Sequence, residues 1–417
     1  MSIAMEREEE GAGVPAAPVA PQGAVDRPGV ALEGRGLGRL VVRNLLLTLV
    51  TLGVYRFWAR TNMRRLIWSG TTVGGDPLQY TGQGRELFVG FLVALVVMLP
   101  VLIVINILTG LIPPTDFALL AVAYAAIGLV FGPLGIVARY HSRRYMLTRT
   151  SWRGLRAGQD ATLGAFFRAH AWPWIATGLT LGLAAPWAAA RTYAYRMAHT
   201  HIGTGRFAAA PRAAALWGPY LPFWAVLLAA TTTFMLFFGP FWVYGQEVLA
   251  ADQQGLPAPA PPQPGLHWLA VSAVLGFAAW LLSIRYRAAR FRHFAATTTL
   301  EGMRFSSTLR ARDLGGVVFG HVAFILLGVF GGGAVAAGFY VLFGKFGGVI
   351  AVPAFFICCY AGFYLSNLLW ALPQTIERAV SSLSIENIAA ADGFMNRADA
   401  GPRRGEGLAD ALGDVGI

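Results

Sequence analysis

The chain has 417 residues, of which 56% are hydrophobic and 13% are charged. Soluble domains carry about a quarter of their residues as charged side chains, so this composition excludes a soluble globular protein and indicates a membrane protein. The formal net charge of +12 comes from arginine, because Lys345 is the only lysine. A basic chain can bind nucleic acid, but the positive-inside rule already accounts for arginines that flank apolar spans. We therefore predict no nucleic-acid partner.

The first 33 residues combine an acidic start with a run of Pro, Ala and Gly. They lack the basic and apolar regions of a signal peptide, and they lack the bulky side chains whose burial offsets the entropy of ordering. We therefore predict a disordered, uncleaved tail over residues 1–33. A second disordered tail is predicted over residues 392–417, which are rich in Gly, Ala and charge.

A short apolar segment follows, in which twelve uncharged residues, 44–55, lie between Arg43 and Arg56. As a helix this segment is about 18 Å long, which is short of a hydrocarbon core about 30 Å thick. Its motif, TLGVYRFWARTNMRR at 51–65, returns as TLGLAAPWAAARTYAYR at 180–196. Proline and glycine interrupt the apolar stretch around the second copy, so we predict that both copies are short re-entrant or interfacial helices.

Other windows of the chain contain no charged side chain and are long enough to cross a bilayer, which takes about 20 apolar residues. These windows are 87–112, 117–138, 213–246, 265–284, 314–344 and 346–376. They predict six full spans. The alternative is a plan of eight spans in which both copies of the motif also cross, as an inverted three-plus-three repeat known in transporters.

The arginines between these segments gather in four connections and are almost absent from the others. If six segments cross, all four basic connections face the cytoplasm; if eight cross, two of them face the opposite side. The positive-inside rule therefore favours six spans, with both termini in the cytoplasm. The linker 245–265, which has acidic residues but no basic one, is then expected outside.

Each basic connection shares one pattern, in which arginines leave an apolar helix and β-forming residues then surround a turn signal. An example is TTVGGDPLQYT at 71–81. This pattern predicts a β-hairpin. Because a lone hairpin is marginal in water, we expect the four hairpins to pair with one another or to pack on the helices as a small cytoplasmic layer.

The predicted fold is an all-α polytopic membrane protein. It is a helical bundle of about six full spans plus two short re-entrant or interfacial helices, with small cytoplasmic β-hairpins. The repeated motif divides the chain into two repeats of the same plan, 34–163 and 164–313, and a C-terminal helical hairpin, 314–391.

Residues 51–91, TLGVYRFWARTNMRRLIWSGTTVGGDPLQYTGQGRELFVGF, resemble the signature of the YjgN-type bacterial inner-membrane proteins, a family of unknown function. The similarity extends over roughly residues 37–387 and leaves out both tails. The resemblance implies an integral protein of the bacterial inner membrane with no established activity. It supplies no catalytic residues to carry over.

The sequence contains no arrangement that specifies a reaction. It has no Ser-His-Asp order, paired carboxylates or phosphate loop, so we predict no enzyme, no catalytic residues and no cofactor. Cys358 and Cys359 are adjacent and match neither a zinc site nor a disulfide framework. His199 and His201 stand two residues apart, as metal ligands on one face of a strand would. They have no acidic or cysteine ligand beside them, so we predict no metal site.

The arginines of the basic connections are the first candidate site. Guanidinium groups that emerge at one membrane face among Trp and Tyr side chains suit anionic lipid headgroups or a phosphorylated solute. The simpler interpretation is a topology signal with an aromatic belt. The candidates are Arg60, Arg64, Arg65, Arg139, Arg143, Arg144, Arg191, Arg196, Arg287 and Arg292.

Polar residues inside the spans are the second candidate site, because such groups normally face a bundle interior or a water-filled path. They are Asn106, Thr231, Thr232, Thr233 and Asn367. The spans contain no Asp or Glu to couple ions, so this set favours a passive pore or small-solute transporter. The alternative is a membrane scaffold or interaction protein that binds anionic lipid headgroups through its cytoplasmic arginines. The expected partner is the lipid bilayer, and the sequence leaves the oligomeric state open.

Overall fold

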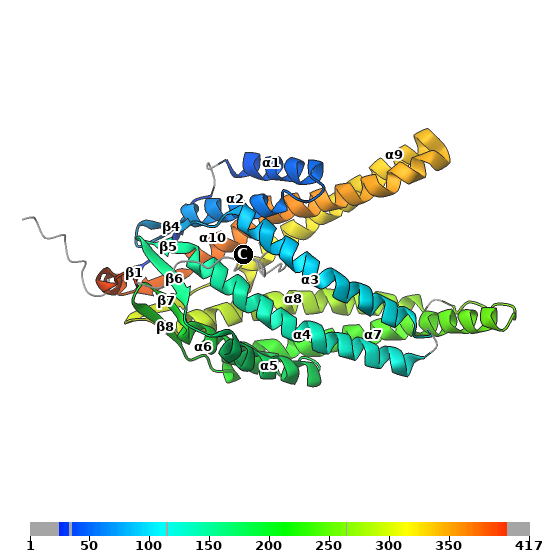
Figure 1. The fold of residues 1–417 in the computed structure, drawn as a ribbon, viewed down its shortest axis with the longest axis horizontal. Helices are drawn as coiled ribbons and strands as arrows, with labels where there is room; N and C mark the ends of the chain where they lie inside the picture. The colour runs from blue at the N-terminus through cyan, green and yellow to red at the C-terminus, as the bar shows by residue number, and fades with distance from the viewer. Residues whose placement is uncertain (1–24, 33–35, 114–115, 264, 398–417) are drawn as a thin grey trace, which may run out of the picture.

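The computed structural model describes residues 25–32, 36–113, 116–263 and 265–397. A curved β-sheet forms one end of the molecule, and the helices run away from it toward the other end (Figure 1). In chain order, each β-hairpin stands between two helices. The sheet therefore collects short pieces that lie far apart in the sequence.

Helices make up most of the described chain. They are α1 (Leu37–Val50), α2 (Arg56–Gly70), α3 (Gly84–Gly110), α4 (Phe117–Thr148), α5 (Leu163–Leu179), α6 (Ala185–Ala198), α7 (Ala214–Gln253), α8 (Leu266–Ala296), α9 (Ala311–Leu365), the π-helix η1 (Ser366–Ala371), α10 (Leu372–Ser381) and the 3-10 helix η2 (Ile388–Gly393). Helix α9 is broken at Gly344, whose φ of 56° is left-handed, so its two halves run as separate helices.

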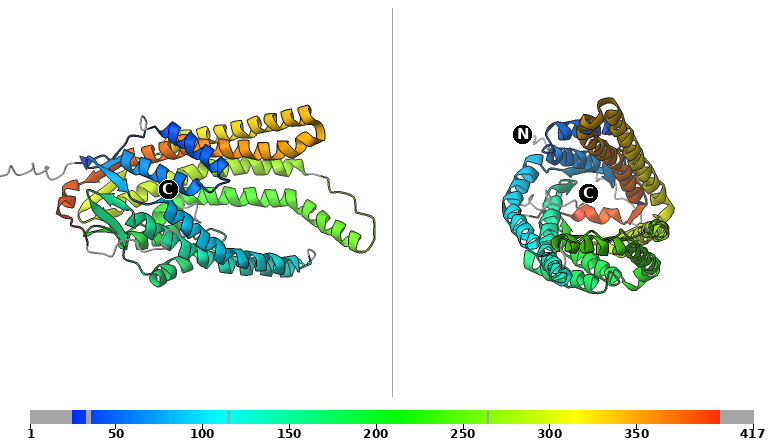
Figure 2. Two further views of the ribbon diagram at one scale, coloured as in Figure 1. Left: turned by 45° about the horizontal axis from the view of Figure 1, so that its top comes forward. Right: turned by 90° about the vertical axis from the view of Figure 1, so that its right-hand side faces the viewer.

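The described part of the chain has six helical stretches that are long and apolar enough to cross a membrane. They are Gly84–Gly110, Leu119–Thr148, Ala214–Gln253, Leu266–Ala296, Ala311–Leu342 and Ala351–Ser381. They form three helical hairpins, whose connections lie at the end away from the sheet (Figure 2). The prediction of about six apolar spans is confirmed.

The repeated motif forms the turn between α1 and α2 and again the turn between α5 and α6. The backbone is left-handed at Leu52 (φ 50°) and Gly53 (φ 93°), and in the same way at Leu181 (φ 49°) and Gly182 (φ 89°). In each copy the glycine N–H donates to the carbonyl oxygen five residues earlier, at 2.7 Å, as in a Schellman motif. This turn ends the first helix, so each copy is a pair of short helices. The prediction of one short helix per copy is corrected accordingly.

The strands pair as one antiparallel sheet. They are β1 (Val25–Asp26), β2 (Gly29–Val30), β3 (Thr71–Val73), β4 (Asp76–Tyr80), β5 (Thr150–Trp152), β6 (Leu155–Gln159), β7 (Thr200–Ile202), β8 (Gly205–Ala209), β9 (Thr298–Leu300), β10 (Met303–Ser307) and β11 (Leu383–Glu386). Among the described residues the order of the eleven strands is β1-β11-β10-β9-β8-β7-β6-β5-β4-β3-β2.

The two edge strands, β1 and β2, are consecutive in the chain. Only residues 27–28 separate them, and this link can span roughly 11 Å at most. In addition, the Asp26 carboxylate accepts a hydrogen bond from the Gly74 N–H at 2.8 Å, so β1 is tied to the β3–β4 turn near the other edge. The N-terminal segment therefore joins the two edges and leaves neither as a long free template for another strand.

The expected fold class, an all-α bundle with small hairpins, is wrong for this end of the molecule. The hairpins join through β4–β5, β6–β7 and β8–β9 pairs into the large sheet, and β11 and β1 extend it. The local signals of a hairpin do not show which hairpins pair, and strands of two to five residues are too short for a clear alternating pattern. Residues 25–32, which we expected in a disordered tail, contain β1 and β2, and β11 lies in the segment expected to be helical.

The hairpin turns follow the predicted turn chemistry. Each connects its strands through two residues, and φ is positive at both residues in Gly74–Gly75, Arg153–Gly154 and Glu301–Gly302. Positive φ at both positions is typical of type I′ turns, whose twist matches that of the flanking strands. Because all four hairpins belong to one sheet, they lie at the same end of the molecule, which the eight-span alternative does not allow.

A small hydrophobic core holds the sheet together. Trp152, Leu300, Met303 and Ile385 are buried in it and pack against Ala391 of η2. These residues come from four strands, β5, β9, β10 and β11, and from the segment after β11. The sheet and the C-terminal segment therefore share one core.

Residues 387–397 then cross the tips of the hairpins. The contacts are Arg153 Nη1 to Asp392 Oδ1 at 2.7 Å, Asn396 Nδ2 to Gly154 O at 2.9 Å, Thr204 N to Met395 O at 2.9 Å, and Arg397 Nη1 to Asp160 Oδ2 at 3.2 Å. Residues 392–397, which were predicted to belong to a disordered tail, are therefore held by the sheet. The rest of both predicted tails, 1–24 and 398–417, lies outside the described residues, and the repeat boundaries at 34, 163 and 313 stay predictions.

Candidate functional site

All ten predicted arginines lie near the ends of the helices that enter the sheet. Arg60, Arg64 and Arg65 are on α2, Arg139, Arg143 and Arg144 are on α4, Arg191 and Arg196 are on α6, and Arg287 and Arg292 are on α8. We call these ten residues the arginine belt. Each precedes a hairpin by about three helical turns or fewer. The helix ends that carry the belt lie next to the sheet (Figure 1).

Several belt arginines hold the fold together. Arg64 is 1% exposed, and its Nη1 donates to the Tyr80 hydroxyl at 3.2 Å. Arg65 Nη2 donates to the Gly82 carbonyl oxygen at 2.8 Å, and Arg292 Nη1 donates to a backbone carbonyl that follows β10. These arginines connect each helix end to the strand that comes after it, so their contacts are structural.

Other belt arginines are on the surface. Arg191 is exposed, and its guanidinium lies 5.7 Å from the centre of the Trp187 ring, in a cation–π contact. Arg287 is also exposed. Arg144 is half-buried and donates from Nη1 to the Tyr140 hydroxyl at 3.2 Å.

Three belt arginines meet in a pocket of about 560 Å³ between α4, α5 and α6. Arg139 and Arg143 come from α4 and Arg196 comes from α6. The pocket is lined by Ile136, Arg139, Ser142, Arg143, Met146, Phe166, His170, Pro173, Trp174, Thr177, Ala188, Ala189, Thr192 and Arg196. We call this cavity the α4–α6 pocket. It combines cationic groups with an apolar wall.

The positive charges of the α4–α6 pocket have few hydrogen-bond partners and no negatively charged partner among the described residues. Arg143 Nη2 donates to Thr200 Oγ1 at 2.8 Å, but Arg143 Nε is buried without a hydrogen-bond partner. Arg196 Nε donates to the Thr192 carbonyl oxygen at 3.3 Å. Within residues 25–32, 36–113, 116–263 and 265–397, none of the three arginines forms an ion pair with a carboxylate.

His170 lies on the α5 side of this pocket. Its ring stacks on Phe166 with the ring centres 3.8 Å apart, and its Nδ1 lies 2.8 Å from the Phe166 carbonyl oxygen. A carbonyl oxygen only accepts, so Nδ1 carries the proton of the neutral ring. Burial lowers the pKa of His170 to about 4, and the positive charges of Arg196, Arg139 and Arg143 act in the same direction. His170 is therefore neutral near pH 7.

The charge density also affects Arg196 itself. Burial lowers the pKa of the Arg196 guanidinium below its ordinary value, and the charges of Arg290 and Arg139 act in the same direction, whereas Tyr193 raises it. Arginine remains charged despite such shifts. The pocket is therefore a partly buried concentration of positive charge.

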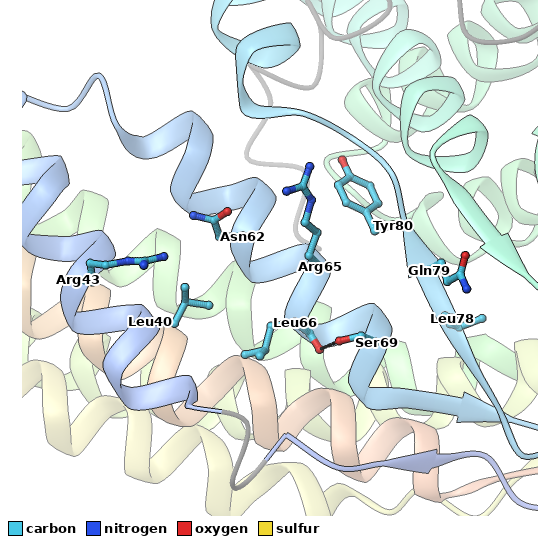
Figure 3. A pocket seen from close by; sticks show the side chains of 9 residues that line it. All are labelled: Leu40, Arg43, Asn62, Arg65, Leu66, Ser69, Leu78, Gln79 and Tyr80. Carbon is cyan, nitrogen blue, oxygen red and sulfur yellow. Dashed lines mark hydrogen bonds between the residues drawn. The ribbon is translucent and has the colours of Figure 1, made fainter.

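A second hollow of about 460 Å³ lies between α1, α2 and β4. Arg43 comes from α1, Asn62 and Arg65 come from α2, and Tyr80 comes from β4 (Figure 3). Arg43 and Arg65 are exposed here. This hollow is more open and less charged than the α4–α6 pocket.

The predicted intramembrane polar path is not assembled as one site. The hydroxyl groups of Thr231, Thr232 and Thr233 on α7 donate to carbonyl oxygens of their own helix, at 2.9, 2.9 and 3.1 Å. Asn106 is exposed on α3, and Asn367 lies in η1. Among the described residues, no hydrogen bond connects these three locations.

Sequence reasoning missed the polar contact that does join two apolar helices. His321 Nδ1 lies 2.6 Å from Ser366 Oγ, and the Ser366 hydroxyl donates to the His321 carbonyl oxygen at 3.1 Å. This pair links the first half of α9 to the start of η1. The available signal was a histidine within an apolar window.

The two histidines considered as metal ligands face different partners in the structure. His199 precedes β7, and its Nδ1 faces the Tyr195 carbonyl oxygen at 2.8 Å. His201 is on β7, and its Nδ1 lies 3.1 Å from Asp160 Oδ1, an acidic neighbour that the sequence does not place beside it. The described residues contain no group of three or more His, Cys, Asp or Glu that could hold a metal.

The helices and the arginine belt together define a polytopic membrane protein with a basic layer where its helices enter a β-sheet. Residues 33–411 match the family described as "Bacterial protein of unknown function (DUF898)", and the chain belongs to this family. It is also 37% identical over 54 residues to the inner membrane protein YjgN of Salmonella typhimurium strain LT2. The resemblance to the YjgN-type family is thus confirmed.

That alignment covers 13% of this chain and 14% of the relative, so it compares one segment of each protein. No solved structure matches the chain. The family description and the name of the relative state no activity.

Proposed function

We propose that the protein is a non-enzymatic, multi-pass protein of the bacterial inner membrane that binds anionic lipid headgroups through its arginine belt. The single observation that carries this proposal is the α4–α6 pocket, where three arginines converge without a carboxylate partner among the described residues. Guanidinium groups form bidentate hydrogen bonds with phosphate, and basic residues between membrane helices are typical of headgroup binding. The name of the Salmonella relative supports the inner-membrane location.

The proposed orientation places the sheet and both termini in the cytoplasm. The belt gathers ten arginines at the helix ends that enter the sheet, and the positive-inside rule puts such a cluster on the cytoplasmic side. Ala208 on β8 and Gln254 after α7 are both exposed, and they lie at opposite ends of the molecule. We expect Ala208→Cys to react with a membrane-impermeant thiol reagent only in inverted vesicles, and Gln254→Cys only in intact cells. The reverse pattern would contradict this orientation.

Retention of lipid tests the headgroup proposal. We expect the purified protein to keep phosphatidylglycerol in preference to phosphatidylethanolamine in native mass spectrometry. A triple variant that replaces exposed helix arginines, Arg191→Gln, Arg285→Gln and Arg287→Gln, should lose part of this preference. A matched triple variant on the strands removes the same charge away from the belt: Arg156→Gln, Arg206→Gln and Arg304→Gln. Equal retention of phosphatidylglycerol and phosphatidylethanolamine by the wild type would refute the proposal.

The passive pore or small-solute transporter is not supported by a specific contact. The threonine hydroxyls on α7 already donate hydrogen bonds to carbonyl oxygens of their own helix, as such groups commonly do in apolar helices. We therefore rank headgroup binding above conduction. Solute flux through reconstituted vesicles that is abolished by Asn367→Leu would reverse this order.

A further inference from the structure

The two copies of the repeated motif differ sharply at the positions that line the α4–α6 pocket. The copies align without a gap from Thr51 with Thr180 to Thr71 with Thr200, and their turns have the same backbone conformation. The same register extends back into α1 and α5, because both helices run without a break into this turn. Each pocket residue on α5 or α6 therefore has a counterpart on α1 or α2. The comparison separates what the shared fold requires from what is special to the second copy.

In the first copy these positions form a closed core. Val41, Asn44, Thr48, Met63 and Ile67 are 0%, 0%, 3%, 1% and 3% exposed. The first three are on α1, which packs against α2, α9 and η1, and the last two are on α2. The first copy therefore shows that these five positions can be filled with closely packed, uncharged side chains.

In the second copy the counterparts are His170, Pro173, Thr177, Thr192 and Arg196, and they border an open pocket against α4. His170 thus stands where the first copy has Val41, and Arg196 stands where it has Ile67. Placing an arginine where a packed isoleucine fits costs desolvation energy unless a partner compensates the charge. The described residues offer no such carboxylate, so the missing partner is expected to be an external anion.

The shape of the pocket indicates the kind of anion. Its polar side has Arg143, with a buried Nε that has no partner, together with Arg196 and Ser142. Nearer the start of α4 the lining includes Trp174, which is 36% exposed and lies so close to Gly132 that a Cβ at this glycine would meet the indole at 2.2 Å. A cationic side and an apolar side in one cavity match an amphiphile better than a small hydrophilic ion.

We propose that the α4–α6 pocket binds the phosphate group of an anionic amphiphile, with the phosphate between Arg143 and Arg196 and the apolar chain on the Trp174 side. This inference rests on the proposed binding of anionic headgroups, and it assigns one specific pocket and the phosphate chemistry. Arg139, at the exposed end of the pocket, attracts the anion as it enters.

The first copy supplies the variant that tests the pocket. In full-length protein we replace the two basic side chains by their counterparts, His170→Val with Arg196→Ile, and titrate with dioctanoyl phosphatidic acid. Because the phosphate then loses the Arg196 guanidinium, the double variant is expected to bind dioctanoyl phosphatidic acid at least about tenfold more weakly. The matched control, the strand triple variant of Arg156, Arg206 and Arg304, should stay within about twofold of the wild type. If the double variant does not fold, Arg143→Lys keeps the charge and removes the bidentate geometry, and it should weaken binding in the same direction.

Two further arms identify the ligand and separate this inference from the broader proposal. Inorganic phosphate that binds as tightly as dioctanoyl phosphatidic acid would show that the ligand is a soluble anion and would overturn the amphiphile assignment. If the triple variant of Arg191, Arg285 and Arg287 weakens lipid binding and the pocket variants do not, the pocket assignment is wrong and the headgroup proposal stands. If none of these variants weakens binding, both are wrong.

Discussion

The sheet and the apolar helices are packed in different ways. In the sheet, Trp152, Leu300 and Met303 are at most 4% exposed and share a core with β11 and η2. In the candidate spans of the described chain, at most 11% of the residues of each apolar window are buried within the protein. The sheet is therefore held by the chain itself, whereas the helices depend on the lipid around them.

Helix α3 shows this dependence most clearly. Val93, Leu95, Val96 and Val97 are all exposed, although consecutive residues of a helix point in different directions. A helix of this kind is stable when hydrocarbon covers it, because its backbone groups are bonded internally. The comparison predicts that changes in the sheet core will be costly and that similar changes on the helices will not.

The largest effect is expected for Trp152→Ala. Trp152 is 4% exposed, and its Nε1 donates to the Val73 carbonyl oxygen at 3.0 Å. Truncation of a buried aromatic side chain costs about 3–5 kcal/mol, and the freed carbonyl adds to the loss. Thermal unfolding in detergent should show a strong decrease in Tm. Trp172→Ala, at a position that is 58% exposed, is the control. Equal losses of stability for the two variants would contradict the proposed contrast.

A smaller effect is expected where α3 and α4 leave the sheet. The Glu86 carboxylate accepts from the Tyr145 hydroxyl at 2.9 Å and from Arg149 Nη2 at 2.6 Å. Glu86→Gln removes the charge opposite Arg149 and should cost about 1–3 kcal/mol, measured by unfolding in the same detergent. Glu247→Gln, on an exposed part of α7, should change stability by less than about 0.5 kcal/mol. An unchanged Tm for Glu86→Gln would show that this contact does not join the two regions.

Acidification should lower the stability of the fold through His170, by a smaller amount than the substitutions above. Because its pKa is lowered to about 4, the folded protein binds fewer protons at this site than the unfolded chain between about pH 6.5 and 4. Stability therefore falls as the pH is lowered through this window, by about 1–2 kcal/mol after allowance for partial exposure. The fall should be reduced in His170→Val. A bound anion would raise the pKa of His170, so added phosphatidic acid should also reduce the fall. If the variant and the wild type respond to pH identically, His170 does not titrate as described.

The smallest effect is expected for Thr232→Val on α7. This side chain is exposed, and its hydroxyl bonds only to the Leu228 carbonyl oxygen of its own helix, at 2.9 Å. The change should alter stability by less than about 0.5 kcal/mol. A large decrease in Tm would show that α7 has a polar contact in the membrane and would weaken the contrast with the sheet.

The sequence predicts the membrane helices well because their signal is local. An uncharged window of about 20 residues is itself the feature that crosses a bilayer. The hairpins were also predictable, since Gly74 and Gly75 provide the positive φ that their turn needs. How the hairpins join into one sheet could not be predicted from the sequence. Pairs such as Phe207 with Leu300 connect residues far apart in the chain, and no local sequence signal sets which residues face each other.

The candidate site was predictable only in part. The arginine list included Arg139, Arg143 and Arg196, but it did not separate them from structural residues such as Arg64. Their convergence depends on how α4 packs against α5 and α6, and His170 enters the site only through that packing. The repeated motif contained one usable signal, the change from Ile67 to Arg196 at equivalent positions.

The pairing of β1 with β11 also sets an order for assembly during synthesis. Asp26 of β1 pairs with Ile385 of β11. Among the described strands β1 is therefore made first, but it cannot pair until β11, the last, has been made. At about 5–20 residues per second, this wait is roughly 20–70 s. Throughout that interval each new hairpin presents an unpaired edge, while the helices between the hairpins are already entering the bilayer. Insertion therefore holds the pieces of the sheet in place before the sheet can close, and the membrane acts as the template for a structure that lies outside it.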